Sequence, residues 1–155
     1  MRAFVYSHNS KEGVREIETH YPKLPSKKSL HVLVKVNYCG VNPVDAKYNL
    51  GDKLPTWLNS LGKWSMDDQG VGYDFSGIII ETPKDAHDCP FSPGDEVFGT
   101  MPPMYGSFRE FILAPINQIA LKPKNLELRE AAVIPLSGLT VLQSLKYDYK
   151  QKSGN

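Results

Sequence analysis

Residues 30–38 read LHVLVKVNY, and the alternation in this stretch decides the class of fold. Positions 30, 32, 34 and 36 are apolar, and most of the positions between them are polar or charged. Side chains with a period of two lie on opposite faces of an extended chain. The pattern therefore predicts a strand with one well-buried face.

Shorter strand patterns lie on both sides of this one, separated by turns rich in Gly and Pro. The sequence predicts a hairpin of two strands around the turn-like HNSKEG, and two C-terminal helices with Asn125 and Ser137 as N-caps. Many short strands with such punctuation predict a chain dominated by β-structure, as a barrel or a sandwich. The expected strands cover 2–7, 14–20, 74–82, 95–99, 106–114 and 118–122, and the expected helices cover 126–133 and 138–149.

Length and charge limit the classes of function. A chain of 155 residues is long enough for one core, and 18 basic against 17 acidic residues give no field that would attract nucleic acid. No apolar run approaches the roughly 20 residues of a membrane span. Two cysteines, Cys39 and Cys89, do not make a secreted disulfide scaffold. We therefore expect a soluble cytoplasmic protein without a nucleic acid partner and without a membrane span.

Isolated motifs name no reaction. A zinc site needs three or four protein ligands. Cys39 has no other candidate ligand near it in the sequence, and the close pair of His87 and Cys89 supplies only half of a coordination shell. The chain has no G-x-S-x-G elbow, no P-loop and no G-x-G-x-x-G fingerprint. The stretch GVGYDFSG precedes a predicted strand, whereas a nucleotide-binding loop would open a helix.

Five blocks taken together are more informative. Their order and spacing resemble the N-terminal catalytic domain of the medium-chain dehydrogenases/reductases, and most of all its zinc-independent branch of quinone oxidoreductases and enone reductases. The resemblance covers almost the whole chain. The blocks are VKVNYCGVNPVDAKYNLG, GVGYDFSGIII, FSPGDEVFGT, GSFREFILAP and EAAVIPLSGLTVLQSL.

The resemblance implies a GroES-like, partly open β-barrel with a few short helices. It implies that residues 1–136 form the catalytic domain and that 137–155 lead toward a Rossmann nucleotide-binding domain that this chain does not contain. The complete parent would reduce quinones or enones with NADPH by hydride transfer. The 155 residues alone are expected to be inactive and to form homo-oligomers through exposed apolar surface.

The same resemblance argues against zinc. The zinc alcohol dehydrogenases have a cysteine ligand where this chain has Asn42 and a histidine ligand where it has Tyr73. Without a Lewis acid, stabilisation of an alkoxide is lost. An enone or quinone accepts a hydride more easily, because conjugation places the charge on oxygen, where a hydrogen-bond donor can stabilise it.

Candidate site residues follow from the NPVDAKY motif. The amide of Asn42 can bond a nicotinamide, a ribose or a substrate oxygen, or equally cap the helix that begins at Pro43. Asp45 is a candidate cofactor contact that reads as mainly structural, because a carboxylate is favoured in a first helical turn. Lys47 is the electrophilic candidate for an enolate oxygen, or a solvated lysine. Tyr48 can stack on a ligand, donate to it, or serve packing.

The SGLTV stretch at 137–141 supplies the remaining candidates. By the resemblance, Thr140 lies near the nicotinamide and Gly138 permits its close approach. The alternative is a capped helix start without a ligand. For the whole chain, the alternative to a reductase is a non-catalytic GroES-like scaffold or interaction module.

Overall fold

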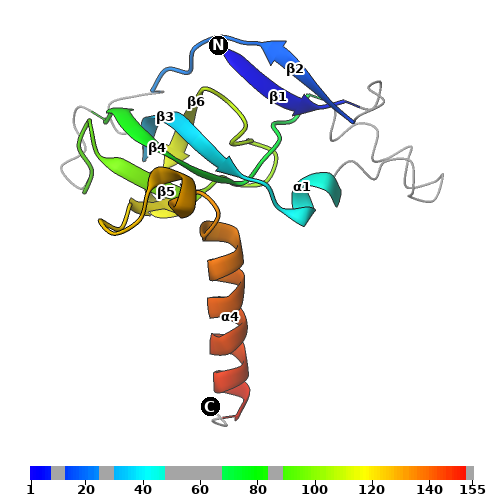
Figure 1. Ribbon diagram of the computed structural model, residues 1–155, viewed down its shortest axis with the longest axis vertical. Coiled ribbons are helices and arrows are strands. Elements are labelled where there is room, and N and C mark those ends of the chain that lie inside the picture. The colour runs from blue at the N-terminus through cyan, green and yellow to red at the C-terminus, as the bar shows by residue number, and fades with distance from the viewer. Residues whose placement is uncertain (8–12, 25–29, 48–67, 84–88, 153–155) are drawn as a thin grey trace.

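The computed structural model describes residues 1–7, 13–24, 30–47, 68–83 and 89–152. Strands dominate the first 121 residues, and helices follow them (Figure 1). The predicted fold class is confirmed: the chain is mostly β-structure in open sheets, with few helices.

A five-stranded antiparallel sheet forms the centre of the molecule, in the order β6-β3-β4-β5-β7. The alternating stretch forms β3 (His31–Gly40), which pairs with β4 (Asp74–Glu81) on one side and with β6 (Phe111–Pro115) on the other. The strands β5 (Glu96–Thr100) and β7 (Ile119–Leu121) complete the sheet, and the 3-10 turn η2 (Ile116–Gln118) precedes β7.

The core lies on one face of this sheet. Its buried side chains come mainly from β3, β4, β5 and β6, and they include Val32 and Val34 of the alternating stretch. Leu33, on the other face of β3, is also buried, whereas Leu30 lies before the strand and is 65% exposed. The two most central strands contribute several fully buried residues, which fixes their register because a slip of one residue would expose them. The cluster consists of Val32, Val34, Phe75, Ile79, Val97, Met101, Ile112 and Ala114.

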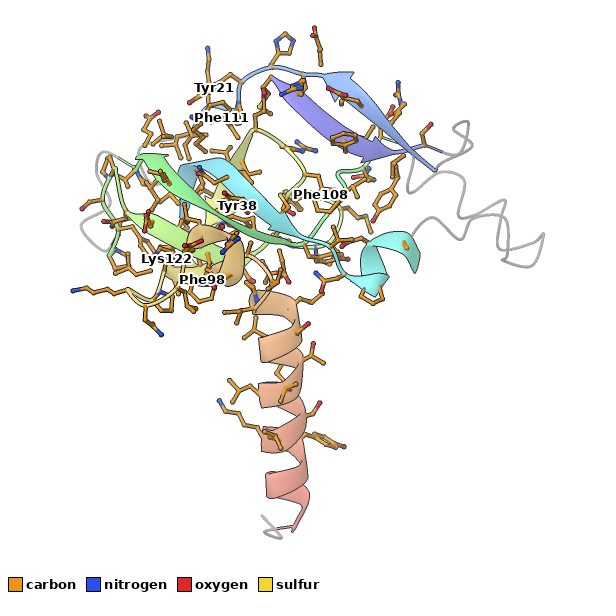
Figure 2. All side chains as sticks on the ribbon, viewed as in Figure 1. Tyr21, Tyr38, Phe98, Phe108, Phe111 and Lys122 are labelled. Atoms are coloured by element: carbon orange, nitrogen blue, oxygen red, sulfur yellow. The ribbon has the colours of Figure 1, made fainter. Side chains whose placement is uncertain are left out.

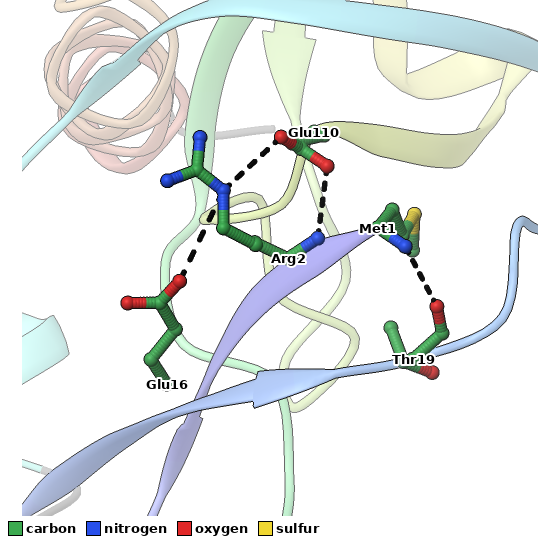
Figure 3. A network of polar contacts seen from close by, with 5 residues as sticks. All are labelled: Met1, Arg2, Glu16, Thr19 and Glu110. Carbon is green, nitrogen blue, oxygen red and sulfur yellow. Dashed lines mark hydrogen bonds and ion pairs between the residues drawn. The ribbon is translucent and has the colours of Figure 1, made fainter.

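The predicted hairpin is present as β1 (Arg2–Tyr6) and β2 (Val14–Glu18), an antiparallel pair. Main-chain bonds connect β1 to the rest of the chain, since Phe4 N donates to Phe108 O and Phe4 O accepts from Val71 N. Figure 3 shows a polar network at the start of the hairpin, in which the main-chain N–H of Arg2 donates to Glu110 Oε2 at 2.8 Å. Met1 N donates to Thr19 O at 2.9 Å in the same network.

The expected strand at 106–114 is shorter than predicted. Residues 106–110 lie outside it, and β6 begins at Phe111. Gly106 has φ +76°, a left-handed conformation that interrupts an extended chain, and Ser107 turns its side chain into the interior. A ring contact lies further along the edge of the sheet, where the centroids of Tyr21 and Phe111 are 4.7 Å apart (Figure 2).

In the described ranges, three helices accompany the sheet: α1 (Pro43–Lys47), α3 (Leu128–Ala131) and α4 (Pro135–Lys152). Both expected N-caps are wrong. Glu127 caps α3 in a reciprocal capping box with Glu130, and α4 begins two residues before Ser137. Proline favours the first position of a helix, which explains the earlier start of α4.

Helix α4 projects away from the sheets, and only its first turns approach them (Figure 1). Its side chains extend into open space around the rod (Figure 2). No helix in the described ranges has the length and apolarity needed to cross a membrane.

Candidate functional site

The NPVDAKY motif and the start of β4 meet at one end of the central sheet. Gly40 of β3 pairs with Asp74 of β4, so Asn42, two residues later, lies beside the Asp74 side chain. Asn42 Nδ2 donates to Asp74 Oδ2 at 3.1 Å. Asp74 is fully buried and Asn42 is 9% exposed.

Asp74 also holds the first turn of α4. Leu136 is the second residue of this helix, and its N–H has no acceptor within the helix. It donates to Asp74 Oδ1 at 3.0 Å and to Oδ2 at 3.2 Å. Asp74, on a strand distant in sequence, therefore caps the N-terminus of α4. The sequence pattern instead predicts Ser137 as this cap.

The buried environment of Asp74 disfavours the ionised form of its carboxyl group. Burial raises the pKa of this carboxyl above its ordinary value, and the bonds from Asn42 and Leu136 oppose that rise. Ser107 Oγ donates to the main-chain oxygen of Asp74 at 3.1 Å and holds the strand from the other side.

Asn42 immediately precedes α1, as expected of a cap, but its side chain bonds Asp74. The capping contacts run the other way: Asn42 N donates to Asp45 Oδ2 at 2.6 Å, and Asp45 N donates to Asn42 O at 3.0 Å. Asp45 thus provides the returning half of a capping box. The interpretation of Asn42 as a side-chain cap is wrong in this respect.

Asp45 is buried in α1 beneath Tyr6, whose hydroxyl donates to Asp45 O at 2.8 Å. Its Oδ1 is buried and accepts no hydrogen bond in the described part of the chain. Burial raises the pKa of Asp45, and the N–H of Asn42 lowers it in part. These contacts fit the structural reading of Asp45.

The two catalytic candidates lie at the edge of the described chain. Lys47 is the last residue of α1, and its side chain lies outside the described residues. Tyr48 lies outside them altogether, as does His87.

The two candidates on α4 lie on its second turn. Thr140 is exposed, and its Oγ1 donates to Leu136 O at 2.7 Å within the helix. A Cβ at Gly138 would meet Ile134 Cγ2 at 3.5 Å, an ordinary contact, so packing does not require a glycine there. Thr140 bonds Leu136, Leu136 bonds Asp74, and Asp74 bonds Asn42. Hydrogen bonds therefore connect the candidate on α4 with the candidate of the NPVDAKY motif.

Sequence reasoning missed Asp74 as the residue that connects them. Its signal is an acid at the start of the strand DFSGIIIE, where every other residue before the final Glu is apolar or small. A buried acid needs partners, so such a position marks a tertiary bond. The sequence alone does not name those partners, because they lie 32 residues before it and 62 residues after it along the chain.

Metal ligands do not gather in the described ranges, where no three His, Cys, Asp or Glu residues approach one another closely enough to hold an ion. The absence of zinc stays a prediction. Cys39 donates to Ser107 O at 3.2 Å, and burial raises the pKa of its thiol to about 11. A protonated thiol of this kind is a poor ligand and a poor nucleophile.

A hollow of about 430 Å³ lies between the hairpin and the end of β3. Its walls include Tyr38, Cys39 and Val41, the residues just before the motif, and Phe4 and Phe108 on the opposite side. Asn42 and the candidates on α4 do not line it.

Comparisons with known proteins agree with this architecture. The alcohol dehydrogenase GroES-like domain matches residues 28–124. A 2-methylene-furan-3-one reductase of Solanum lycopersicum is 29% identical over 94% of this chain and 37% of its own length. A chloroplastic NADPH-dependent alkenal/one oxidoreductase of Arabidopsis thaliana is 30% identical over 88% of this chain and 35% of its own.

Among solved structures, the quinone oxidoreductase of Coxiella burnetii is similar with a TM-score of 0.75 and 29% identity, over 95% of this chain and 44% of that one. The chain thus spans less than half the length of each of these three relatives. The resemblance is confirmed, because the family match covers residues 28–124 and these three relatives align with 88 to 95% of this chain. The chain belongs to the alcohol dehydrogenase GroES-like domain family.

Proposed function

We propose that this chain is the catalytic-domain portion of an oxidoreductase that uses NADPH to reduce quinones or activated carbon-carbon double bonds. The observation that carries the proposal is the hydrogen-bonded path from Asn42 through Asp74 to the first turn of α4. It joins the two segments that hold the candidate cofactor contacts. The enone-reducing relative and the quinone oxidoreductase with the same fold support the choice of substrates.

In this proposal residues 1–136 are the catalytic domain, and 137–155 lead into a nucleotide-binding domain of the complete protein. The described residues fit the nicotinamide end of NADPH in two respects. The side of α4 at Gly138 is open enough for a methyl group, and the amide of Asn42 is anchored on one side only. When bound, NADPH supplies the hydride.

The remaining roles belong to side chains of this chain. Lys47 stabilises the oxygen that gains charge as the substrate is reduced, and Tyr48 contacts the substrate beside it. Asn42, Gly138 and Thr140 orient the nicotinamide end, and Asp45 supports Asn42 from below. No zinc takes part.

We further propose that the protein is cytoplasmic and forms homo-oligomers. The support for association is the apolar side chains that α4 exposes, such as Val141 and Leu145. A small quinone or enone is the only other partner that the proposal requires.

The test is a spectrophotometric assay of the complete protein with NADPH and, in separate reactions, 1,4-benzoquinone and but-3-en-2-one. Oxidation of NADPH that depends on either substrate is the expected result. The 155-residue chain assayed in parallel should be inactive. A complete protein that binds no NADPH and reduces neither compound would overturn the proposal in favour of a non-catalytic scaffold.

A further inference from the structure

Asp74 has a buried carboxylate that accepts hydrogen bonds from two N–H groups. Asn42 Nδ2 and Leu136 N are its partners, at 3.0 to 3.2 Å. We propose that Asp74 is a positioning residue, which turns the amide of Asn42 so that its carbonyl oxygen Oδ1 accepts a hydrogen bond from the nicotinamide end of the cofactor. This inference rests on the proposed function.

The orientation of the Asn42 amide follows from the chemistry of its partner. With Asp74 ionised, its carboxylate only accepts hydrogen bonds, so the group that Asn42 turns toward it is the NH2 group, as the contact from Nδ2 has it. The other bond to the carboxylate comes from a main-chain N–H, whose donor character is fixed. Oδ1 of Asn42 must therefore face away from Asp74.

The oxygen Oδ1 is left for a ligand. No residue in the described part of the chain donates a hydrogen bond to it, and Asn42 as a whole residue is buried with 9% of its surface exposed. One N–H of the amide also remains beside it, since Nδ2 carries two hydrogens and Asp74 accepts one.

The side of the Asn42 amide that faces away from Asp74 determines which chemical groups it can bind. The nicotinamide carboxamide and the ribose hydroxyls carry hydrogen-bond donors, whereas the oxygen of a quinone or enone only accepts. The edge therefore favours the cofactor over the substrate. It fits the carboxamide particularly well, because that group offers both a donor and an acceptor.

The substitution Asp74→Asn tests this orientation while preserving shape. The new amide can still accept from Leu136 N with its oxygen, and it then turns its NH2 group toward Asn42. Asn42 must flip to accept that bond, and its exposed edge then presents the NH2 group. We expect the affinity of the complete protein for NADPH to fall about 10-fold, with the cap of α4 retained.

A reciprocal exchange provides the rescue. In the double variant Asn42→Asp with Asp74→Asn, the carboxylate at position 42 accepts from the amide at position 74 and presents its second oxygen to the ligand. The pair keeps one negative charge and regains an acceptor at the exposed edge. We expect NADPH affinity to return to within about 3-fold of wild type, a recovery that a merely structural role for Asp74 does not predict.

Ser107→Ala is the matched control. It removes a hydrogen bond to Asp74 in the same buried region, but to the main-chain oxygen and not to the carboxylate. We expect lower thermal stability with NADPH affinity unchanged. Equal losses of affinity in Ser107→Ala and Asp74→Asn, or no recovery in the reciprocal exchange, would overturn the inference.

Two further measurements separate the possible failures. The reduced 3-acetylpyridine analogue of NADPH lacks the carboxamide N–H, so weaker binding to wild type but not to Asp74→Asn assigns the bond to the carboxamide. Equal binding of the analogue, with Asp74→Asn still impaired, assigns it to a ribose hydroxyl. If wild type binds no NADPH, the proposed function fails, and NMR of the Asn42 side-chain amide then tests the orientation alone: an NH2 signal that does not change in Asp74→Asn would overturn it.

Discussion

At the scale of single residues, Asp45 has a carboxyl group whose charged form is disfavoured by its surroundings. Burial raises its pKa, and its Oδ1 has no partner in the described ranges. A raised pKa means that the folded state holds the proton more tightly, so the stabilising contribution is complete below the ordinary Asp pKa and is lost as pH rises through the folded value. Ionisation of Asp45 at neutral pH therefore opposes folding.

We expect Asp45→Asn to remove this pH dependence. The amide oxygen can still accept the bond from Asn42 N, and the variant carries no charge to bury. The free energy of unfolding of the variant should rise relative to wild type as pH increases from 3 to 7, by roughly 1.4 kcal/mol for each pKa unit by which folding raises the pKa of Asp45. Urea denaturation of both proteins across that range measures it. A difference that stays constant with pH would show that the carboxyl does not titrate on folding.

Lys47 is the residue whose substitution tests catalysis most directly. If its cation stabilises the developing oxyanion, Lys47→Met in the complete protein should lower kcat by about 10-fold or more, with little change in NADPH affinity. Steady-state kinetics and a binding titration measure the two quantities separately. Lys146→Met on α4 is a matched control that should leave both unchanged. Equal kinetics for Lys47→Met and wild type would assign Lys47 to the solvated surface.

Zinc content is a second prediction about single residues. By the sequence resemblance, Asn42 and Tyr73 stand where the zinc alcohol dehydrogenases have ligands, and the Asn42 side chain already bonds Asp74. We expect elemental analysis of the complete protein to find far less than one zinc per chain. Near one zinc per chain that survives dialysis against a chelator would contradict this prediction.

At the scale of elements, the sequence predicted best where a pattern is local. The alternation in 30–38 identified β3 because each side chain reports its own face. The start of α4 was missed because its cap is Asp74, which lies 62 residues earlier in the sequence. The start of β6 was missed because Gly106 has a positive φ, which its sequence neighbours do not reveal.

The candidate site divides in the same way. The motif located Asn42 and the segment that carries Gly138 and Thr140, because short blocks of sequence mark both. It did not indicate that Asp74 connects them, since the contact of Asn42 with Asp74 depends on the register of β3 with β4, and the bond from Leu136 depends on where α4 packs. The roles of Lys47 and Tyr48 remain predictions, because they lie at or beyond the edge of the described residues.

A substitution in helix α4 should increase the stability of the 155-residue chain and weaken NADPH binding by the complete protein. Gly138→Ala should stabilise the 155-residue chain by about 1 kcal/mol, because alanine is the better helix former and its methyl group meets only an ordinary contact with Ile134. In the complete protein the same methyl group should obstruct the nicotinamide and raise the KM for NADPH about 10-fold.

Denaturation of the chain and steady-state kinetics of the complete protein measure these two effects. Ser144→Ala is the control on the same helix, two turns further from the sheet, and should leave the KM unchanged. A stabilised Gly138→Ala variant with an ordinary KM would show that Gly138 does not face the cofactor.

At the scale of the whole molecule, α4 exposes more apolar surface than an isolated helix can keep in water without cost. Leu145 is 63% exposed and Val141 59%, and Leu139 and Leu142 are nearly half exposed. These four residues lie on α4, which projects away from the sheets after its first turns (Figure 1). Such a surface tends to be covered by another protein surface.

We therefore expect the 155-residue chain to self-associate, with the α4 helices of two copies packed together or exchanged. Exchange of a terminal element is an inexpensive route to a dimer, because it reuses contacts that already exist. Light scattering should give a mass that rises with concentration toward two chains or more.

The double variant Leu142→Glu with Leu145→Glu should stay a monomer, since charges on α4 would have to be desolvated on association. Leu30→Glu, an equally exposed leucine on the sheet side of the molecule, should associate like wild type. A chain that keeps the mass of one copy at every concentration would show that α4 remains uncovered in water, and the expectation of a homo-oligomer would then lose its physical basis.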